Sequence, residues 1–404
     1  MSNQWAFSSL GCVGRFQAGY GFPIEYQGKD SGDLPFAKVG DISATARRGQ
    51  TYIHSAGNYV DRSELPILKA KTIPEGSIVF AKIGEAIRQN FRAIAAQEML
   101  IDNNSMALIP DLKKVDTGFL YHFMCQLDLY QYTGATTVPA IRKSTLEEIK
   151  IPLPPLAEQK RIAAILDKAD ALRRKRLRAI ELADQFLRSV FLDMFGDPVT
   201  NPKGWNIFSL VNGIQSIDSG WSANGDNTPA TKEQLGVLKI SAVTSGIFRP
   251  EENKAVDIQS VPAGKKLLKP RAGDLLFSRA NTRELVAATA IVNDDYDNLF
   301  LPDKLWRVST NEKLMPEFLH FLLKQPRMRD RLTSQATGTS GSMLNISKKK
   351  FEETPAIFPP AHLQRRFAEI YRKSGDFIAL DRDSAEELHS LFSSLSQQAF
   401  SGKL

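Results

Sequence analysis

An internal repeat constrains this chain more than any other feature of its sequence. Residues 156–195 and 361–400 align without gaps at an offset of 205 residues, and each segment directly follows a double proline. A fixed offset of this kind is the signature of a structural unit that is written more than once. The order of the shared positions makes chance improbable: Gln159 pairs with Gln364, Arg161 with Arg366, Ile165 with Ile370 and Phe195 with Phe400.

The repeat continues upstream of both segments, where the gaps vary in length. The stretch 34–43 parallels 235–244, and the apolar run 76–82 parallels 273–279. Because these matches keep the same order in both halves, we interpret the chain as one unit that is present twice.

Each half begins with a globular part. Short apolar and β-branched runs bounded by Gly, Pro and Asn, such as 76–82 and 286–292, predict strands joined by turns. The stretches 119–130 and 316–324 predict short helices. We therefore expect an α/β (α+β) fold with two tandem globular domains, each large enough for its own core.

The domain boundaries follow from the repeat and from the turn-rich junction 196–204. We predict a first globular domain at 1–155, a central long helix at 156–195, a second globular domain at 196–360 and a C-terminal long helix at 361–404.

The two long segments have the pattern of paired helices. Forty helical residues would span about 60 Å at ~1.5 Å per residue. Apolar residues recur at heptad spacing and form a broad stripe, which another helix would cover. We predict an antiparallel coiled coil; the alternative is that each helix packs only on its own domain. The predicted contact positions are Ile162, Ile165, Leu172, Arg176, Phe186, Val190, Phe367, Ile370, Phe377, Asp381, Leu391 and Leu395.

Charged residues stand near the middle of both helices. Arg176 and Asp381 occupy equivalent heptad positions, 205 residues apart. A pseudo-twofold axis would bring the helix midpoints together, and an unpaired buried charge would be costly, so we expect these two side chains to pair. The basic run 173–176 predicts a solvated or partner-facing helix surface.

The composition permits nucleic acid as a partner without requiring it. Lys and Arg total 52 against 45 Asp and Glu, which gives a net charge of +7 and is compatible with binding to phosphates. Two cysteines, Cys12 and Cys125, predict free thiols in a reducing compartment, most simply the cytoplasm. No apolar stretch approaches the ~18 residues of a membrane span, and no secretory signal is visible at the start.

No convincing catalytic motif is present. Nucleotide-binding loops, zinc-protease motifs and nucleophile elbows are missing, and the five histidines lack metal-ligand spacing. Asp111, Glu148 and Lys150 fit a loose pattern of Mg²⁺-dependent nucleases, in which the carboxylates hold the metal. The second half keeps a Pro-Asp pair at 302–303 but has no lysine in 353–355. We therefore expect no metal site and no catalysis.

Polar and basic loops recur at equivalent places in both halves. Arg and Lys can neutralise phosphates, and Asn, Gln, Ser and Thr can hydrogen-bond to base edges. The alternative for any one residue is an ordinary exposed loop. The predicted DNA-binding residues are Lys82, Arg88, Gln89, Asn90, Thr136, Thr137, Arg142, Lys143, Arg279, Asn281, Thr282, Arg283, Ser340, Ser342, Asn345 and Lys348.

Four stretches carry a resemblance to a known family: 151–159, which leads into the first long helix, the junction 194–205, the strand-loop 273–279 and the C-terminal 399–404. On these residues the chain resembles the specificity subunits of type I restriction–modification enzymes, over essentially its whole length.

The resemblance implies a non-catalytic subunit that binds double-stranded DNA with a bipartite target. Each globular domain would be a target-recognition domain for one half, and the helices would fix the spacer. Two modification subunits with S-adenosylmethionine would dock on the chain, and restriction subunits with ATP and Mg²⁺ would join them. No cofactor would be bound by this chain itself.

Two other functions stay open at this point. One is a stand-alone Mg²⁺-dependent nuclease or DNA methyltransferase with a duplicated fold. The other is a coiled-coil adaptor whose domains bind proteins. A gel shift with randomised duplexes separates them, because the adaptor predicts no DNA binding and the enzyme predicts turnover without added subunits.

Overall fold

The computed structural model describes residues 5–134, 137–338 and 343–404, and within the last helix it leaves out the side chains of 376–386. The chain divides into two compact units. Unit 1 comprises Met1–Ala179 and Asp381–Leu404, and unit 2 comprises Ile180–Leu380. Each unit is therefore one globular part plus a portion of both long helices.

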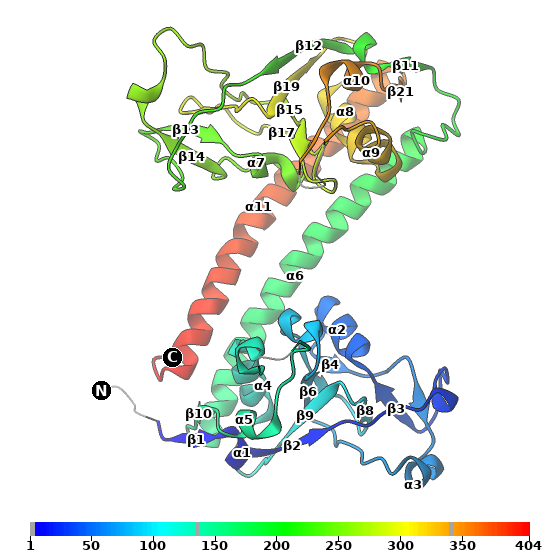
Figure 1. The fold of residues 1–404 in the computed structure, drawn as a ribbon, viewed down its shortest axis with the longest axis vertical. Helices are drawn as coiled ribbons and strands as arrows, with labels where there is room; N and C mark the ends of the chain where they lie inside the picture. Colours follow the sequence, from blue (N-terminus) through cyan, green and yellow to red (C-terminus); the bar gives the residue numbers. More distant parts are fainter. Residues whose placement is uncertain (1–4, 135–136, 339–342) are drawn as a thin grey trace. The chain divides into compact units, whose positions relative to one another are not determined.

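The two long helices have the bounds that the repeat predicts. Helix α6 runs over Leu156–Phe195 and α11 over Ala361–Phe400, forty residues each (Figure 1). Proline is tolerated just before a helix because the first turn needs no donor there, and this fixes both starts. Among the described residues, no helix combines the length and the apolar character that crossing a membrane requires.

Unit 1 is built on a mixed five-stranded sheet with the strand order β2-β9-β6-β7-β4. Its strands are β2 (Gly14–Ala18), β9 (Ser105–Pro110), β6 (Ile78–Ala81), β7 (Arg92–Ala95) and β4 (Tyr52–Ile53); smaller sheets join β5 (Tyr59–Val60), β3 (Leu34–Ala37) and β8 (Leu100–Ile101), and β1 (Phe7–Ser9) with β10 (Lys150–Pro152). Its helices are α1 (Leu10–Val13), α2 (Val39–Arg47), α3 (Leu65–Leu68), α4 (Thr117–Gln126) and α5 (Lys143–Glu147), with 3-10 turns η1 (Ile24–Tyr26), η2 (Arg62–Glu64), η3 (Glu85–Gln89) and η4 (Leu129–Tyr132).

Unit 2 repeats this plan with the strand order β12-β19-β15-β17. Its strands are β12 (Ile214–Ser219), β19 (Leu305–Thr310), β15 (Leu275–Ser278) and β17 (Thr289–Ile291), then β14 (Asn253–Val256), β13 (Leu235–Leu238) and β18 (Leu299–Phe300), and the pairs β11 (Ile207–Ser209) with β21 (Pro355–Ile357) and β16 (Ala280–Asn281) with β20 (Leu344–Asn345). Its helices are α7 (Ser241–Thr244), α8 (Pro316–Lys324), α9 (Pro326–Thr333) and α10 (Lys348–Glu352), with 3-10 turns η5 (Leu210–Asn212) and η6 (Ile258–Ser260).

The predicted mixture of strands and short helices is confirmed, but several bounds differ: α4 starts at Thr117, before the expected 119, and the run 286–292 forms a strand only at Thr289–Ile291. The helix expected at 119–130 ends at Gln126, because Leu127 has an extended backbone. Asp128 then starts a separate 3-10 turn, its carboxylate accepting a hydrogen bond from the Tyr130 N–H at 3.0 Å. Short polar side chains commonly divert the backbone from a helix in this way.

A buried glutamine ties the start of α6 to the globular part of unit 1. The Gln159 side chain is 1% exposed. Its Oε1 accepts from the Asp116 N–H at 2.8 Å, and its Nε2 donates to the carbonyl oxygens of Lys114 at 3.1 Å and Pro154 at 2.8 Å. The side chain thereby satisfies three backbone groups that the turn before α4 and the helix start would leave unpaired.

Gln364, the repeat partner of Gln159, does the same at the start of α11 in unit 2. It accepts from the Met315 N–H at 3.0 Å and donates to the carbonyl oxygens of Lys313 at 3.0 Å and Pro359 at 2.8 Å. The duplication thus extends from sequence to individual hydrogen bonds.

In unit 1 the start of α6 packs with the end of α11. Ile162 and Leu166 lie in the same buried cluster as Ala399. The ring of Phe400 lies 5.1 Å from that of Phe119 and 5.4 Å from that of Phe123, centroid to centroid. The two helix segments and α4 therefore share one core.

In unit 2 the end of α6 packs with the start of α11. The ring of Phe367 lies 5.4 Å from Phe191 and 5.7 Å from Phe195, and Phe195 lies 4.8 Å from Phe318 of α8. Since the start of one helix meets the end of the other within each unit, the prediction of an antiparallel pairing is confirmed.

The heptad positions predicted for this pairing are only partly right. Ile162 and Phe367 are fully buried, and Val190, Ile370 and Leu395 pack at the edges of the two cores. Three positions are wrong, because their side chains are 48%, 55% and 50% exposed: Leu172, Phe186 and Leu391. Ile165 is half-buried outside these clusters and Arg176 is exposed.

The reason is that each helix end packs on a globular part as well as on the other helix. The buried face then follows the helix period of 3.6 residues and not the coiled-coil period of 3.5. Leu187 and Phe191 are buried where the heptad frame placed Phe186 and Val190. The side chains of Phe377 and Asp381 lie outside the described residues, so the pairing of Arg176 with Asp381 stays a prediction.

The basic run of α6 is also used differently from the prediction. Arg174 Nη1 donates to the Gly49 carbonyl at 2.7 Å, and its Nη2 lies 2.5 Å from Asp170 Oδ2. The Arg173 guanidinium lies 5.6 Å from the ring centre of Phe392 on α11. These two arginines are therefore bound within unit 1, and the prediction of a solvated or partner-facing surface is wrong for them.

Candidate nucleic-acid interface

In unit 1 the two predicted DNA-binding loops come together at the end of strand β6. Lys82 follows the strand directly, and its carbonyl accepts from the Ile141 N–H at 2.9 Å. The Gly84 N–H donates to the Pro139 carbonyl at 2.8 Å. These backbone bonds hold the loop after β6 against the loop that leads into α5.

Unit 2 builds the same junction at the end of strand β15. The Arg279 carbonyl accepts from the Ile346 N–H at 2.8 Å, and β16 pairs antiparallel with β20. Two loops that are far apart in sequence therefore meet beside the same strand in each unit.

The loop after β6 presents a cation on an aromatic ring. The Arg88 guanidinium lies 3.7 Å from the ring centre of Tyr130, and its Nε lies 2.8 Å from Glu85 Oε2. Gln89 Oε1 accepts from Arg47 Nη2 at 2.8 Å. These side chains are exposed, and a cation over an aromatic face keeps its charge available to an anionic ligand.

Asn90 has a structural role instead of the predicted one. Its backbone is left-handed, with φ 55°. Its Nδ2 donates to the Leu127 carbonyl at 2.9 Å, and its Oδ1 accepts from the Leu129 N–H at 3.1 Å. Both ends of the amide bind the connection to η4, so this geometry does not support base reading by Asn90.

The second loop of unit 1 contributes exposed groups. Thr137, Arg142 and Lys143 are exposed, and Lys143 Nζ lies 3.5 Å from Glu147 Oε1 in the same short helix. Thr136 lies outside the described residues.

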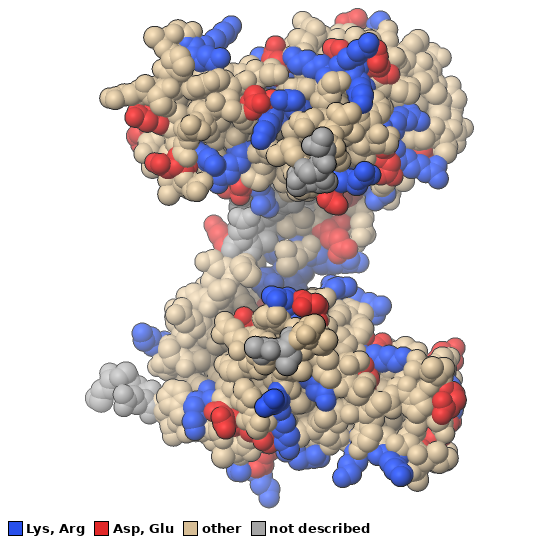
Figure 2. All heavy atoms as spheres, viewed as in Figure 1, with Lys and Arg blue, Asp and Glu red and all other residues tan. Residues whose placement is uncertain are grey.

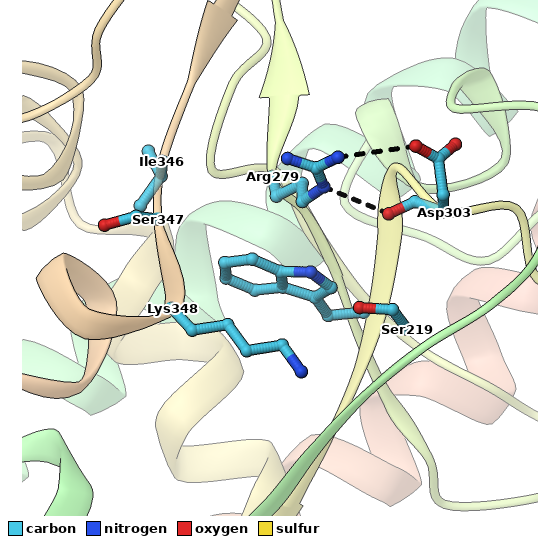
Figure 3. A pocket seen from close by; sticks show the side chains of 7 residues that line it. Ser219, Arg279, Asp303, Ile346, Ser347 and Lys348 are labelled. Atoms are coloured by element: carbon cyan, nitrogen blue, oxygen red, sulfur yellow. Dashed lines mark hydrogen bonds and ion pairs between the residues drawn. The ribbon is translucent and has the colours of Figure 1, made fainter.

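In unit 2 the junction surrounds a cavity of about 260 Å³. Arg279 and Asp303 are bonded to each other in its wall: Arg279 Nε donates to the Asp303 carbonyl at 3.0 Å, and Nη2 lies 3.3 Å from Oδ2 (Figure 3). Lys348 reaches the cavity from α10, and its Nζ donates to the Ile217 carbonyl at 2.6 Å. The lining residues are Ser219, Arg279, Asp303, Trp306, Ile346, Ser347 and Lys348.

The cavity suits an anionic ligand. Two cations, Arg279 and Lys348, and one carboxylate, Asp303, line it. The bonds to Asp303 use Nε and Nη2 of Arg279, which leaves Nη1 to donate to a ligand. A guanidinium held in one orientation by a carboxylate is well prepared for a phosphate or for a guanine edge.

Asn281, Thr282, Arg283 and Asn345 were also predicted to bind DNA, and none of them lines this cavity. Asn281 Oδ1 accepts from the Thr282 N–H at 2.8 Å, and the Asn345 backbone bonds to Thr337. Arg283 is exposed. Ser340 and Ser342 lie outside the described residues.

Positive and negative side chains are mixed on the visible surface of both units. Figure 2 shows lysine and arginine side chains interspersed with aspartate and glutamate on the visible face of each unit. Binding to an anion therefore depends on individual placed cations more than on one uniform basic patch.

Asp303 is the most informative residue that sequence reasoning misplaced. The Pro-Asp pair at 302–303 was aligned with Asp111. In the structure Asp303 comes just before β19, as Asp102 comes just before β9. The counterpart of Asp111 is Asn311, because both side chains accept the backbone N–H two residues later, at 3.2 and 3.0 Å.

This assignment leaves the nuclease pattern around Asp111 without a carboxylate counterpart in the second half. Asp111 Oδ2 lies 3.3 Å from Lys114 Nζ in an exposed ion pair. Within the part of the chain that the structure describes, no group of three or more His, Cys, Asp or Glu residues is arranged to hold a metal ion.

The comparisons with known proteins find similarity to one family. Residues 2–182 match the family model described as the type I restriction modification DNA specificity domain. The chain is 24% identical to the EcoKI specificity subunit of Escherichia coli K12, with 93% of this chain and 90% of the relative covered. It is 22% identical to the EcoBI specificity subunit of Escherichia coli, with coverage of 100% and 86%.

A solved structure shows the same fold. The S subunit of a type I restriction–modification system from M. genitalium superposes with a TM-score of 0.62 at 13% identity, and covers 98% of this chain and 96% of that one.

Proposed function

We propose that this chain, which is similar over nearly its whole length to specificity subunits of type I restriction–modification enzymes, is itself such a subunit and reads a bipartite DNA target, one half with each unit. The observation that carries the proposal is the duplicated junction of two loops at the end of β6 and of β15. The same backbone arrangement occurs twice, but its side chains differ.

The differences favour an asymmetric target. Unit 1 offers Lys82 and the Arg88–Tyr130 pair, and unit 2 offers Arg279 and Lys348 around a cavity. Lysine binds phosphates as a point charge, whereas arginine presents a planar fork that matches a guanine edge. Different side chains on equivalent backbones would give each half of the target its own sequence.

The long helices would set the distance between the two half-sites. Both α6 and α11 contribute residues to the cores of both units. A continuous helix of forty residues is a stiff element with a rise of ~1.5 Å per residue. In this proposal the spacer length is a property of helix length and not of either globular part.

The partners in this proposal follow from the family. Two modification subunits would dock on the helices and globular parts, one for each half of the duplicated chain, and would carry S-adenosylmethionine and the adenine methylation chemistry. Restriction subunits would bring ATP and Mg²⁺. The chain itself supplies recognition and no catalytic group.

Exchange of one globular part tests the proposal. We expect replacement of 206–355 by the equivalent region of a relative to change one half of the methylated target and leave the other half and the spacer unchanged. Mapping methylated adenines in a host that carries the exchanged subunit measures this. A change in both halves would show that the units do not read independently.

A second experiment tests the lack of catalysis. The purified chain should neither methylate nor cut DNA in the presence of Mg²⁺, ATP or S-adenosylmethionine. Cleavage that disappears in Glu148→Gln would restore the nuclease hypothesis.

A further inference from the structure

A second cavity of about 70 Å³ lies in unit 2, beside the first residues of β17. It lies at the same end of the sheet as Arg279, because the Ala287 N–H donates to the Ser278 carbonyl at 2.9 Å. None of its lining residues was among the predicted DNA-binding residues. Those used here are Thr244, Ser245, Gly246, Thr289, Lys324 and Arg329.

Lys324 places its ammonium group over the turn that ends α7. A Cβ at Gly246, where φ is 78°, would lie only 3.4 Å from Lys324 Nζ. The nearest carboxylate is Asp184 of α6, 3.3 Å away and 60% exposed. An exposed partner of this kind is largely screened by water, so it leaves much of the positive charge unbalanced.

Arg329 is a half-buried cation without a carboxylate partner. Its Nη2 donates to the Glu284 carbonyl. No carboxylate of the described residues lies within ion-pair distance of it, and burial lowers the pKa of its guanidinium. The neighbouring Asp330 favours its charged form but forms no ion pair with it. A cation that is partly removed from water and lacks an ion pair is an unfavourable arrangement, which an anion would relieve.

Unit 1 closes the equivalent place with its own side chains. The turn after α2 ends at Gly49, with φ 69°, and its carbonyl accepts a hydrogen bond from Arg174, which also pairs with Asp170. On the sheet, Arg92 opposes Phe80 as Thr289 opposes Phe277. Unit 2 therefore has a short side chain where unit 1 has a long one. Its Lys324 pairs only with the exposed Asp184, whereas Arg174 of unit 1 pairs with the buried Asp170, which it shares with Arg173.

We propose that this cavity of unit 2 binds one backbone phosphate of the DNA, with Lys324 and Arg329 as the cations that hold it. Thr244 and Ser245 line the same space, but their hydroxyl groups donate to the carbonyl oxygens of Ser241 and Ile247, both at 3.2 Å, so the two cations carry the proposal. The proposal rests on the proposed function, and it makes the phosphate contacts of the two half-sites unequal.

The test is the salt dependence of DNA binding by the assembled modification complex. Loss of one phosphate contact makes the slope of log K against log salt less negative by about 0.9, so Lys324→Gln should reduce the affinity change between 50 and 200 mM salt by about 3- to 4-fold. The specificity ratio should stay unchanged. The matched control is Lys313→Gln, an exposed lysine at the opposite end of β19, which should keep the wild-type slope.

A modified duplex locates the contact. Neutral methylphosphonates placed singly along the second half-site should weaken wild-type binding at one position that has no effect on Lys324→Gln. Arg329→Gln should reproduce this result; because Arg329 also bonds to Glu284, Lys324→Gln remains the decisive variant if Arg329→Gln fails to fold.

Three outcomes would overturn the inference. One is an unchanged slope in Lys324→Gln. Another is that inorganic phosphate raises the melting temperature of the wild type but not of Lys324→Gln, while the salt slope of DNA binding is the same in both. That result would mean that the cavity binds a free anion. The last is loss of modification-subunit binding in Lys324→Gln, which would assign it to a protein carboxylate. Failure of the proposed function would differ from all three, because the wild-type complex would then show no selective DNA binding.

Discussion

The two units share a backbone frame and differ in the side chains that the frame presents. Gln159 and Gln364 make three equivalent hydrogen bonds each. At the strand ends, by contrast, Lys82 stands where the other unit has Arg279 held by Asp303. What has been kept is the hydrogen bonding that fixes the helix starts, and what has diverged is the chemistry available to a ligand.

The interiors differ as well, at one pair of equivalent positions. In unit 1 the buried Arg92 donates to the Leu127 carbonyl at 2.7 Å. In unit 2 the hydroxyl of Thr289 lies 2.9 Å from His320 Nδ1, and both side chains are fully buried. The same backbone arrangement therefore holds, in unit 1, a cation that donates to backbone carbonyls through both Nη atoms while its Nε has no partner, and in unit 2 a threonine–histidine pair.

The largest loss of stability should come from replacing the two glutamines that hold the helix starts. Each of Gln159→Ala and Gln364→Ala strands three backbone groups, which at ~1–3 kcal/mol per unsatisfied buried group predicts a loss of about 3 kcal/mol or more. Hydrogen exchange measures it separately for each unit. Lys160→Ala, at an exposed neighbouring position, should change little. Clearly unequal losses for the two glutamines would mean that the frames are not equivalent.

Substitutions at the ends of β6 and β15, by contrast, should have unequal effects on DNA binding. We expect Arg279→Ala to cost about 1–3 kcal/mol of specific binding, because it removes an oriented fork, and Lys82→Ala to act chiefly on the salt slope. Titration of the assembled complex with matched and mismatched duplexes measures both. Equal losses of specificity would refute the distinction between the two sites.

The sequence predicted the parts of the molecule that depend on local signals. Helix α6 has the predicted bounds, and α11 starts at the predicted residue but ends at Phe400, four residues before the predicted end. The double prolines and the gap-free apolar pattern specify the two starts. The meeting of the two loops beside β6 and β15 was not visible, since it depends on backbone pairing between distant residues. Leu172 and Phe186 were assigned to the core because a heptad frame cannot show that a globular part covers one side of the helix.

Two functional candidates were missed for different reasons. Asp303 was aligned by its Pro-Asp pair with Asp111, although its place before β19 matches Asp102. Lys324 and Arg329 had no signal, because the repeat has no cation at the equivalent positions of unit 1. The cavity of unit 2 was recognised only by comparison with unit 1, where Arg174 and Asp170 fill the equivalent place.

A smaller difference between the units should appear on acidification. Burial, aided by nearby Lys324, holds the pKa of His320 well below its usual 6.5. The unfolded chain then takes up a proton below pH 6.5 that the folded unit does not, so the contribution to stability is lost as pH falls. We expect unit 2 to lose about 1 kcal/mol between pH 7.5 and 5.5 through this group.

His320→Gln isolates this contribution. Denaturation at several pH values should show that the variant lacks the extra loss, while unit 1, which has Tyr121 as the fifth residue of α4 where α8 has His320, keeps its wild-type profile. An identical pH profile in variant and wild type would show that His320 is protonated in the folded unit.

The smallest effect should distinguish the observed helix packing from the heptad frame. Leu172→Ala should change the stability of unit 1 by no more than about 0.5 kcal/mol, as for other exposed positions. Leu166→Ala, one and a half turns earlier and fully buried, should cost about 2–5 kcal/mol. Comparable losses in urea denaturation would restore Leu172 to the core.

The division of the chain also has a consequence for its synthesis. Unit 2 is a continuous stretch, Ile180–Leu380, whereas unit 1 needs both Met1–Ala179 and Asp381–Leu404. Ala399 is fully buried in the core of unit 1, and Phe400 contacts two of its phenylalanines. The unit that leaves the ribosome first can therefore complete its core only when the last residues have been added, and a nascent chain that stops a few residues early damages the domain that was made first.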